Sequence, residues 1–320
     1  MKGSVDRLTI LDGVIIAVGW CEDDSPEVVI DGQPVAQQSC LRYSRPDVDQ
    51  HLGGGLGEKY GFKIAALAPG PIDNSKLSVQ LSKGRVLNAT PAVPEDRIEK
   101  VFHHFMKEVL AAPENASLIE LGSRARSGNS YRSLFTSISN YTGVDVRDGE
   151  NVDVVTDLHV LSKTINTQYD FAFSVSVFEH LLMPWVVAVE LNNVLSIGGI
   201  AYIQSHPTWP LHDEPWDFFR FSKDAWHGIF NALTGFEIME SAYGLEANIV
   251  PVATKRSLAS LLSAYRTEDY VSPRAQGVEL QGLDMQQTFL LSACLVKKVA
   301  KPRVDWSCDP SEVYDLGYKY

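Results

Sequence analysis

The chain has 320 residues, of which 45% are hydrophobic and 21% charged, so it has enough apolar material for a sizeable core and does not have the composition of a disordered protein. Its 28 basic and 40 acidic side chains give a formal net charge of −12. A surface this acidic disfavours binding to nucleic acid or anionic lipid, which both require basic patches, and suits a neutral or carbohydrate ligand better.

The cysteines and the ends of the chain indicate a compartment. Cys21, Cys40, Cys294 and Cys308 have neither zinc-site nor disulfide-framework spacing. The first residues lack the apolar segment of a signal peptide, and no run of about 18 apolar residues occurs. We therefore expect a cytoplasmic protein without membrane insertion.

The first part of the chain has the pattern of short strands separated by turns. Asp12-Gly13 joins two apolar runs and Asp31-Gly32 repeats the arrangement, as in β-hairpins. Glycines within 53–57 predict a flexible loop. Several short strands with regular turns favour a small all-β sandwich, which we place at residues 1–92.

A helical pattern follows this segment. Apolar residues recur at the spacing of one helix face, at Ile98, Val101, Phe102, Phe105, Met106, Val109 and Leu110. Pro94 and Pro113 bracket the pattern. We predict a linker helix behind a domain boundary near residue 92, with His103 and His104 at its surface or in its packing.

Strand and helix patterns alternate from Ser117 onward. Strands are expected at 117–121, 141–144, 152–155, 170–175, 199–204, 236–241 and 288–296, and helices at 128–138, 184–195 and 222–233. This alternation predicts an α/β fold with a doubly wound, mostly parallel, seven-stranded sheet at residues 93–300. An apolar helix within 251–286 interrupts the pattern, and 301–320 is expected to be a tail.

Polar residues stand at the ends of the first three predicted strands, where open α/β sheets bind ligands. Gly122 permits a tight turn and close approach of a ligand to the backbone. Glu120 could hold a cationic amine, Asp145 both hydroxyls of a ribose, and Asp157-Leu158 an adenine amino group and ring. These residues predict a nucleoside-containing cofactor.

Each of these residues also has a structural interpretation. Gly122 could be an ordinary loop glycine, and Asp145 and Asp157 could be helix caps or turn residues. All three at successive strand ends are less readily explained in this way. NAD is the competing cofactor, but Glu120 within the first turn would repel its pyrophosphate.

The same segments are similar to four motifs of the class I S-adenosylmethionine-dependent methyltransferases. The matching segments are 118–128, 143–145, 170–180 and 195–203, in the order and spacing of that family. The first loop is longer than usual and carries two arginines, and Ile197 replaces a proline. The resemblance implies S-adenosylmethionine as cofactor, with a binding set of Glu120, Gly122, Ser123, Asp145, Asp157, Leu158 and Ser174.

A dense group of polar and aromatic residues follows the fifth strand of this sheet. Residues 215–222 resemble the P-W-D-x-x-R-F-S segment of a methyltransferase subgroup associated with bacterial surface polysaccharides. Trp209 and Trp216 suit stacking on a sugar ring, and Asp217 and Arg220 complete the expected substrate-binding set. Asp217 and Arg220 could equally form an ion pair that shapes the loop.

Transfer to a hydroxyl requires positioning and a base. His206, His212 and His180 are the candidate bases, in that order of preference, because imidazole titrates near neutrality. Two of these histidines with Asp217 are an alternative set of metal ligands. Their spacing is not diagnostic, so the expected site contains no metal.

These observations favour an enzyme that methylates an oxygen of a sugar or glycan intermediate of surface polysaccharide. One alternative is a non-catalytic methyltransferase-like protein that binds a glycan or a partner, and another is methylation of a small metabolite or lipid head group. A glycosyltransferase or a second copy of the chain is the expected partner class. The front segment resembles β-sandwich modules of the same systems and is expected to serve binding or dimerisation.

Overall fold

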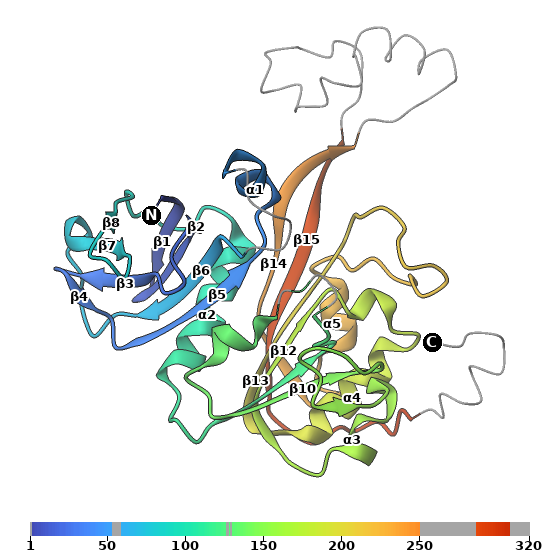
Figure 1. The fold of residues 1–320 in the computed structure, drawn as a ribbon. Helices are drawn as coiled ribbons and strands as arrows, with labels where there is room; N and C mark the ends of the chain where they lie inside the picture. The colour runs from blue at the N-terminus through green and yellow to red at the C-terminus, as the bar shows by residue number, and fades with distance from the viewer. Residues whose placement is uncertain (1, 53–58, 126–127, 129, 250–285, 308–320) are drawn as a thin grey trace, which may run out of the picture.

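The structure, a computed structural model, describes residues 2–52, 59–125, 128, 130–249 and 286–307. The predicted glycine loop at 53–57, the helix expected within 251–286 and most of the tail at 301–320 lie outside the described residues. Figure 1 shows the chain passing from a β-rich part through one helix into a larger α/β part.

The β-rich part contains two four-stranded antiparallel sheets. One has the order β1-β2-β6-β5, with β1 at Gly3–Leu11, β2 at Val14–Cys21, β6 at Gly61–Leu67 and β5 at Gln37–Tyr43. The other has the order β4-β3-β7-β8, with β4 at Gln33–Pro34, β3 at Glu27–Ile30, β7 at Leu77–Gln80 and β8 at Val86–Leu87. Short helices at Pro46–Leu52 (α1) and Asn74–Lys76 (η1) connect strands. Both predicted hairpins are confirmed, with φ of 51° and 83° at Asp12 and Gly13 and of 53° and 73° at Asp31 and Gly32.

Strand β2 is buried on both of its faces. Ile15 and Ala17 point into a core shared with the second sheet, where they join Val28 and Val79. Val14 and Ile16, on the opposite face, join the core around the following helix. The alternation of a strand thus explains the continuous apolar run in β2, because each face covers a different layer.

The predicted helix at 98–110 is confirmed as α2, Arg97–Ala111. The Asp96 side chain caps it by accepting a hydrogen bond from the Ile98 N–H at 2.9 Å. One side of α2 packs on the β1-β2-β6-β5 sheet and the other on the larger sheet, so both sheets share one core with it. His103 is fully buried in this packing, and its Nε2 lies 3.2 Å from Oγ1 of Thr9 in β1.

The α/β part is built on a seven-stranded sheet with the order β11-β10-β9-β12-β13-β15-β14. Its strands are β9 at Ser117–Leu121, β10 at Asn140–Asp145, β11 at Val154–Val155, β12 at Tyr169–Val175, β13 at Leu195–Ser205, β14 at Phe236–Ile249 and β15 at Gln286–Lys298. The first five are parallel to one another, and β15 is antiparallel to both β13 and β14. Renumbered along the sheet, the order is 3-2-1-4-5-7-6, a Rossmann-like doubly wound sheet with its last strand inserted near the edge.

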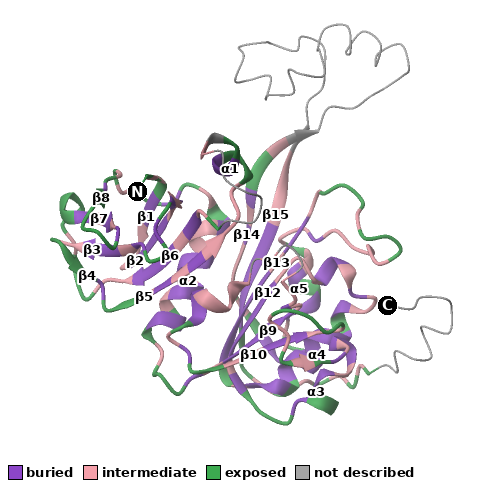
Figure 2. Cartoon of the chain, in the orientation of Figure 1, coloured by how far each residue is buried: buried purple, intermediate pink, exposed green. Residues whose placement is uncertain are grey.

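Helices cover the face of this sheet that lies opposite α2. They are α3 at Leu161–Thr164, α4 at Pro184–Val194 and α5 at Ala225–Ile229, with the 3₁₀ turns η3 at Leu158–Val160 and η4 at Phe178–His180. Their apolar side chains form one core with those of β9, β12, β13 and β15. Figure 2 shows this burial along the central strands, while β14 and β15 extend beyond the rest of the sheet.

Two predicted helices were wrong in form or length. The helix predicted at 128–138 is absent from the described part of that segment, which instead forms a 3₁₀ turn, η2, at Tyr131–Phe135. Ser130 starts this turn by accepting from the Arg132 N–H, a local bond by which serine competes with helix. The helix predicted at 222–233 shortens to α5, with the Ser222 hydroxyl accepting from the Ala225 N–H at 3.1 Å.

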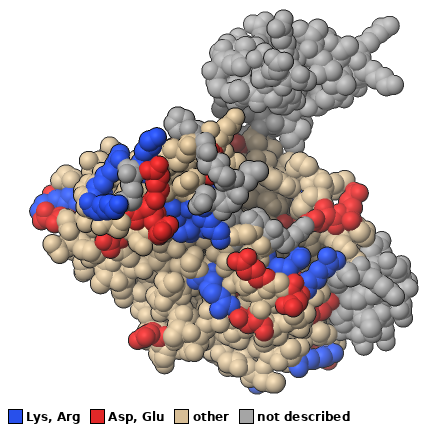
Figure 3. Space-filling model, viewed as in Figure 1, with Lys and Arg blue, Asp and Glu red and all other residues tan. Residues whose placement is uncertain are grey.

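On the face viewed in Figure 3, basic and acidic side chains lie in small separate groups with wide areas of other residues between them. None of the described helices is long and apolar enough to cross a membrane.

Candidate functional site

A cavity of about 440 Å³ opens at the carboxyl ends of β9, β10 and β12, where a doubly wound sheet binds its ligand. Four of the seven predicted cofactor-binding residues line it. These are Gly122, Asp145, Asp157 and Leu158. The sheet order therefore brings together three strand ends that lie up to 36 positions apart in the sequence.

Gly122 is the position where the chain leaves β9 and turns along the cavity. Its φ is +73°, which L-amino acids with a side chain rarely adopt. A Cβ at this position would also overlap Cγ2 of Val177, which lines the same cavity. Glycine is thus required here for two reasons: the backbone conformation disfavours a side chain, and there is no room for a Cβ beside Val177.

Asp145 ends β10 with its side chain 13% exposed. One carboxylate oxygen, Oδ1, accepts a hydrogen bond from the Arg147 N–H at 2.9 Å, which fixes the turn after the strand. The same oxygen lies 3.6 Å from Nε of Arg124, another residue of the cavity wall. The carboxylate is therefore held at the cavity by its own turn and faces a cation across it.

Asp157 follows β11 and begins η3. Its Oδ1 accepts from the His159 N–H at 2.9 Å and lies 2.6 Å from Nδ1 of the same histidine. Nε2 of His159, a buried ring, accepts in turn from the Met183 N–H at 3.1 Å. His159 thus fixes the orientation of Asp157, a role that its sequence spacing did not indicate.

The charge of the cavity wall favours a cationic ligand. Its ionised side chains are four carboxylates and two guanidinium groups, those of Asp145, Asp157, Asp213, Glu214, Arg124 and Arg147. These six groups give the wall an excess of two negative charges. Such a site attracts a sulfonium and repels the pyrophosphate of a dinucleotide.

The other predicted cofactor residues lie behind the wall. Ser174 is fully buried beneath Leu121, and Ser123 donates to the Asn151 carbonyl at 2.9 Å. Glu120 points into the core on the α2 side, where it accepts hydrogen bonds from the Tyr141 hydroxyl and from Nδ2 of Asn151. Burial raises the pKa of Glu120 to about 7. None of the three is among the described residues that line the cavity.

Trp216 and His180 also line the cavity. Nδ1 of His180 lies 2.5 Å from the Trp216 carbonyl oxygen, so the two residues are fixed relative to each other. Ser176, with φ of +56°, is a further residue of the cavity wall and was not anticipated from the sequence. The loop after β13 thus returns to the strand ends and closes one side of the cavity.

Asp217 and Arg220 form the bidentate ion pair that was one of the two interpretations of their spacing. The two nitrogen–oxygen distances are 2.5 and 2.7 Å, and the Asp217 carboxylate also accepts from the His212 N–H at 2.9 Å. The pKa of Asp217 is lowered, chiefly by its hydrogen bond with Arg220. This pair shapes the loop and does not line the cavity.

His206 and His212 also lie outside the cavity wall. His206 is 7% exposed and stacks on Trp209, with ring centroids 4.7 Å apart, and its Nε2 is 3.1 Å from the hydroxyl of Ser176. The rings of His180 and His212 are 4.8 Å apart. The three candidate bases are therefore neighbours, but His180 alone among them reaches the cavity.

A scan against protein-family models gave no match, and neither did a comparison with curated proteins. Solved structures that are similar include an S-adenosylmethionine-dependent methyltransferase from Clostridium acetobutylicum, at 8% identity over 63% of this chain and 90% of that one, with a TM-score of 0.39.

Two further similar structures bear related names. One is an S-adenosylmethionine-dependent methyltransferase from Archaeoglobus fulgidus, at 11% identity over 62% of this chain and 94% of that one, TM-score 0.36. The other is coclaurine N-methyltransferase bound to N-methylheliamine and S-adenosylhomocysteine, at 13% identity over 63% and 70%, TM-score 0.34. Likenesses at this level carry no argument about the activity of this chain.

Proposed function

We propose that this chain is an S-adenosylmethionine-dependent methyltransferase that methylates a hydroxyl oxygen of a sugar or glycan. The observation that carries the proposal is the joint presence of Gly122, Asp145 and Asp157-Leu158 in the wall of one negatively charged cavity. Any one of them has a structural role, but their meeting in one wall supports a common role of the three strand ends in binding one ligand.

The wall residues fit the parts of the cofactor. Asp145 accepts hydrogen bonds from the two ribose hydroxyls, and Asp157 and Leu158 hold the amino group and ring of adenine. Gly122 allows the backbone to approach the ligand closely. Arg124, the first arginine of the lengthened loop, pairs with the carboxylate of the amino-acid part.

The opposite end of the cavity receives the acceptor. Trp216 offers a flat apolar face for a sugar ring, and His180 is placed to take the proton of the acceptor hydroxyl. When bound, the cofactor supplies a methyl group on a sulfonium sulfur, which leaves with the electron pair of the broken S–C bond. The chain contributes by holding the acceptor oxygen in line and by drawing off its proton.

The β-rich part, residues 1–92 in this proposal, binds a glycan or a partner such as a glycosyltransferase of surface-polysaccharide synthesis. Helix α2 supports a fixed arrangement, because it packs on the β1-β2-β6-β5 sheet and on the seven-stranded sheet at once. A module held in this way positions what it binds relative to the cavity. Its role is therefore to be tested in the full chain.

Calorimetric titration of the full-length protein with S-adenosylhomocysteine tests the proposal, with NAD as control. We expect one binding site for the former and none for the latter. Labelled S-adenosylmethionine with a panel of nucleotide sugars and surface glycans then identifies the acceptor. Failure of S-adenosylhomocysteine to bind would overturn the proposal and favour a glycan-binding or partner-binding protein without methyl transfer.

A further inference from the structure

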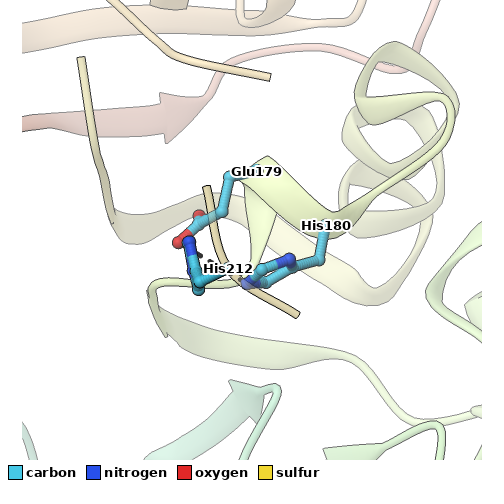
Figure 4. Close-up of side chains that lie close together, drawn as sticks. All are labelled: Glu179, His180 and His212. Atoms are coloured by element: carbon cyan, nitrogen blue, oxygen red, sulfur yellow. Dashed lines mark ion pairs between the residues drawn. The ribbon is translucent and has the colours of Figure 1, made fainter. Parts of the chain in front are cut away.

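Three histidines and one glutamate meet beside the acceptor end of the cavity. They come from η4, from the residue after β13 and from the loop beyond it, and they are Glu179, His180, His206 and His212. Figure 4 shows the side chains of Glu179, His180 and His212 pointing toward one another. One potential ligand atom from each of these three lies within 4.8 Å of the others.

The Glu179 carboxylate is the centre of this cluster and is fully buried. Its Oε2 accepts a hydrogen bond from the Ser205 hydroxyl at 2.6 Å. Its Oε1 has no hydrogen-bond partner among the described residues, although an ionised oxygen that is buried without compensation is costly. That oxygen lies 3.5 Å from Nε2 of His206 and 3.9 Å from Nε2 of His180.

The histidines are oriented as metal ligands commonly are. Nδ1 of each ring lies within hydrogen-bonding distance of a main-chain carbonyl: 2.5 Å for His180 to Trp216, 3.2 Å for His206 to Leu290 and 3.1 Å for His212 to Pro210. In the neutral ring Nδ1 then carries the proton, and Nε2 presents its lone pair. The Asp217 carboxylate also lies 3.4 Å from Nδ1 of His212.

A hydrolase-like relay does not explain the arrangement. In such a relay the carboxylate orients one ring nitrogen while the other nitrogen faces a hydroxyl. Here Nε2 of His206 faces both Glu179 and the Ser176 hydroxyl, at 3.5 and 3.1 Å, and Nδ1 faces the main chain. A shared cation between Nε2 atoms and a carboxylate oxygen is the arrangement that this geometry fits.

We propose that Glu179, His180, His206 and His212 bind one divalent transition-metal cation, and that the acceptor hydroxyl of the methyl transfer completes its coordination. Imidazole and carboxylate ligands suit Zn²⁺, Fe²⁺ or Co²⁺. Metal–ligand bonds of about 2.1 Å place neighbouring ligands of a five-coordinate cation about 3.0 to 3.6 Å apart. The 3.5 Å between Glu179 and His206 lies in this range, and the 3.9 Å between Glu179 and His180 would shorten slightly on binding.

The position of the cluster gives this cation a role. His180 lines the cavity, and so does Ser176, the hydrogen-bond partner of His206. An open coordination position on that side faces the acceptor. A hydroxyl bound to a divalent cation loses its proton more readily. With the cation bound, His180 therefore acts as a ligand in place of the base role given above, and the released proton passes to solvent. This role rests on the proposed methyl transfer, whereas cation binding does not.

The ligand set differs from the one considered from the sequence, which paired two histidines with Asp217. Asp217 is already engaged by Arg220, and the carboxylate with an uncompensated oxygen is Glu179. Its neighbours His206 and His212 are 27 and 33 positions away, so the sequence spacing gave no signal.

The test is a titration of the full-length protein, first treated with a chelator, with Co²⁺. Binding is monitored through the visible absorption of the bound Co²⁺. We expect one equivalent to bind with the d–d bands of mixed nitrogen and oxygen ligands. Glu179→Gln, which keeps a Ser205 acceptor but removes the charge, and His212→Ala in the exposed loop should each weaken binding at least 100-fold. His227→Ala, an exposed histidine of α5, is the matched control and should bind as the unaltered protein does.

Three results would overturn the proposal. They are the absence of saturable Co²⁺ binding to the unaltered protein, equal binding by Glu179→Gln, and equal loss in His227→Ala. S-adenosylhomocysteine is titrated into the same samples. If S-adenosylhomocysteine binds and Co²⁺ does not, the metal site is rejected and the proposed cofactor site stands. If Co²⁺ binds and S-adenosylhomocysteine does not, the proposed cofactor site is rejected and the metal site stands. If Glu179→Gln does not fold, His212→Ala and the stoichiometry of the unaltered protein decide.

Discussion

Nε of Arg124 lies 3.6 Å from Oδ1 of Asp145 across the wall of the cavity. The same nitrogen is buried and has no hydrogen-bond partner among the described residues. The guanidinium lines the cavity with a side chain that is 27% exposed, so its N–H groups can donate to an anionic group of a ligand, and the amino-acid carboxylate of the proposed cofactor is such a group.

Replacing Arg124 by alanine should therefore weaken binding of S-adenosylhomocysteine by roughly 10- to 100-fold, since one charge-assisted hydrogen bond contributes about 1.5–3 kcal/mol. Binding of 5′-methylthioadenosine, which lacks the amino-acid part, should stay unchanged. Calorimetry with both ligands measures the difference. An equal loss for the two ligands would show that Arg124 acts on the adenosine part or on the fold.

Removing the Asp145 carboxylate should abolish most cofactor binding without unfolding the protein. Asp145→Ala loses both acceptors proposed for the ribose hydroxyls, so we expect a decrease in affinity of about 100-fold or more. Asp148→Ala, an exposed aspartate of the same turn, is the control and should bind normally. Undiminished affinity in Asp145→Ala, with thermal unfolding unchanged, would mean that the ribose binds elsewhere.

Substitutions at Gly122 and Gly128 distinguish two contributions to the loss of stability: a positive φ at a residue with a side chain, and steric overlap of the added Cβ. Both have a positive φ, of 73° and 72°, but only Gly122 faces an atom that a Cβ would overlap. We expect Gly128→Ala to lower the free energy of unfolding by about 1 kcal/mol and Gly122→Ala by about 3 kcal/mol or more. Urea titrations measure both. Equal losses would contradict the close contact between residue 122 and Val177.

The raised pKa of Glu120 predicts a pH dependence of stability. Its pKa is about 7 in the folded protein, where burial disfavours the charged form, against about 4.3 in an unfolded chain. Between these values the folded state holds a proton that the unfolded state has lost. The free energy of unfolding should therefore fall as the pH rises from about 4.3 to 7 and stay level above that range.

Glu120→Gln should remove this component, because a neutral amide replaces the carboxyl. At each pH we compare the free energy of unfolding of the variant with that of the unaltered protein. This difference should be more favourable to the variant at pH 8 than at pH 5, by about 3 kcal/mol from the size of the shift. Denaturant unfolding at the two values measures the difference. Glu108→Gln, an exposed glutamate of α2, should show no such change, and a flat difference for Glu120→Gln would place its pKa near normal.

Local sequence determined the elements and several of their ends. The Asp-Gly pairs fixed both hairpins, because their backbone conformation requires residues that tolerate positive φ. Apolar spacing located α2, and alternation of strand and helix patterns located the strands of the larger sheet. These features depend on residues a few positions apart, so the sequence expresses them directly. The helix predicted for the serine-rich segment at 128–138 was wrong, because the spacing of its apolar residues fits a 3₁₀ turn as well as an α-helix.

The tertiary structure decided which of these residues meet. The order of strands in the sheet places Asp145 and Asp157 in one cavity wall and turns Glu120 to the opposite face, beside Leu118, because side chains of a strand alternate. It also placed α2 between two sheets, and it gathered Glu179, His180, His206 and His212 around one buried carboxylate oxygen. Such contacts arise from the packing of segments that are distant in sequence, so local sequence patterns do not predict them.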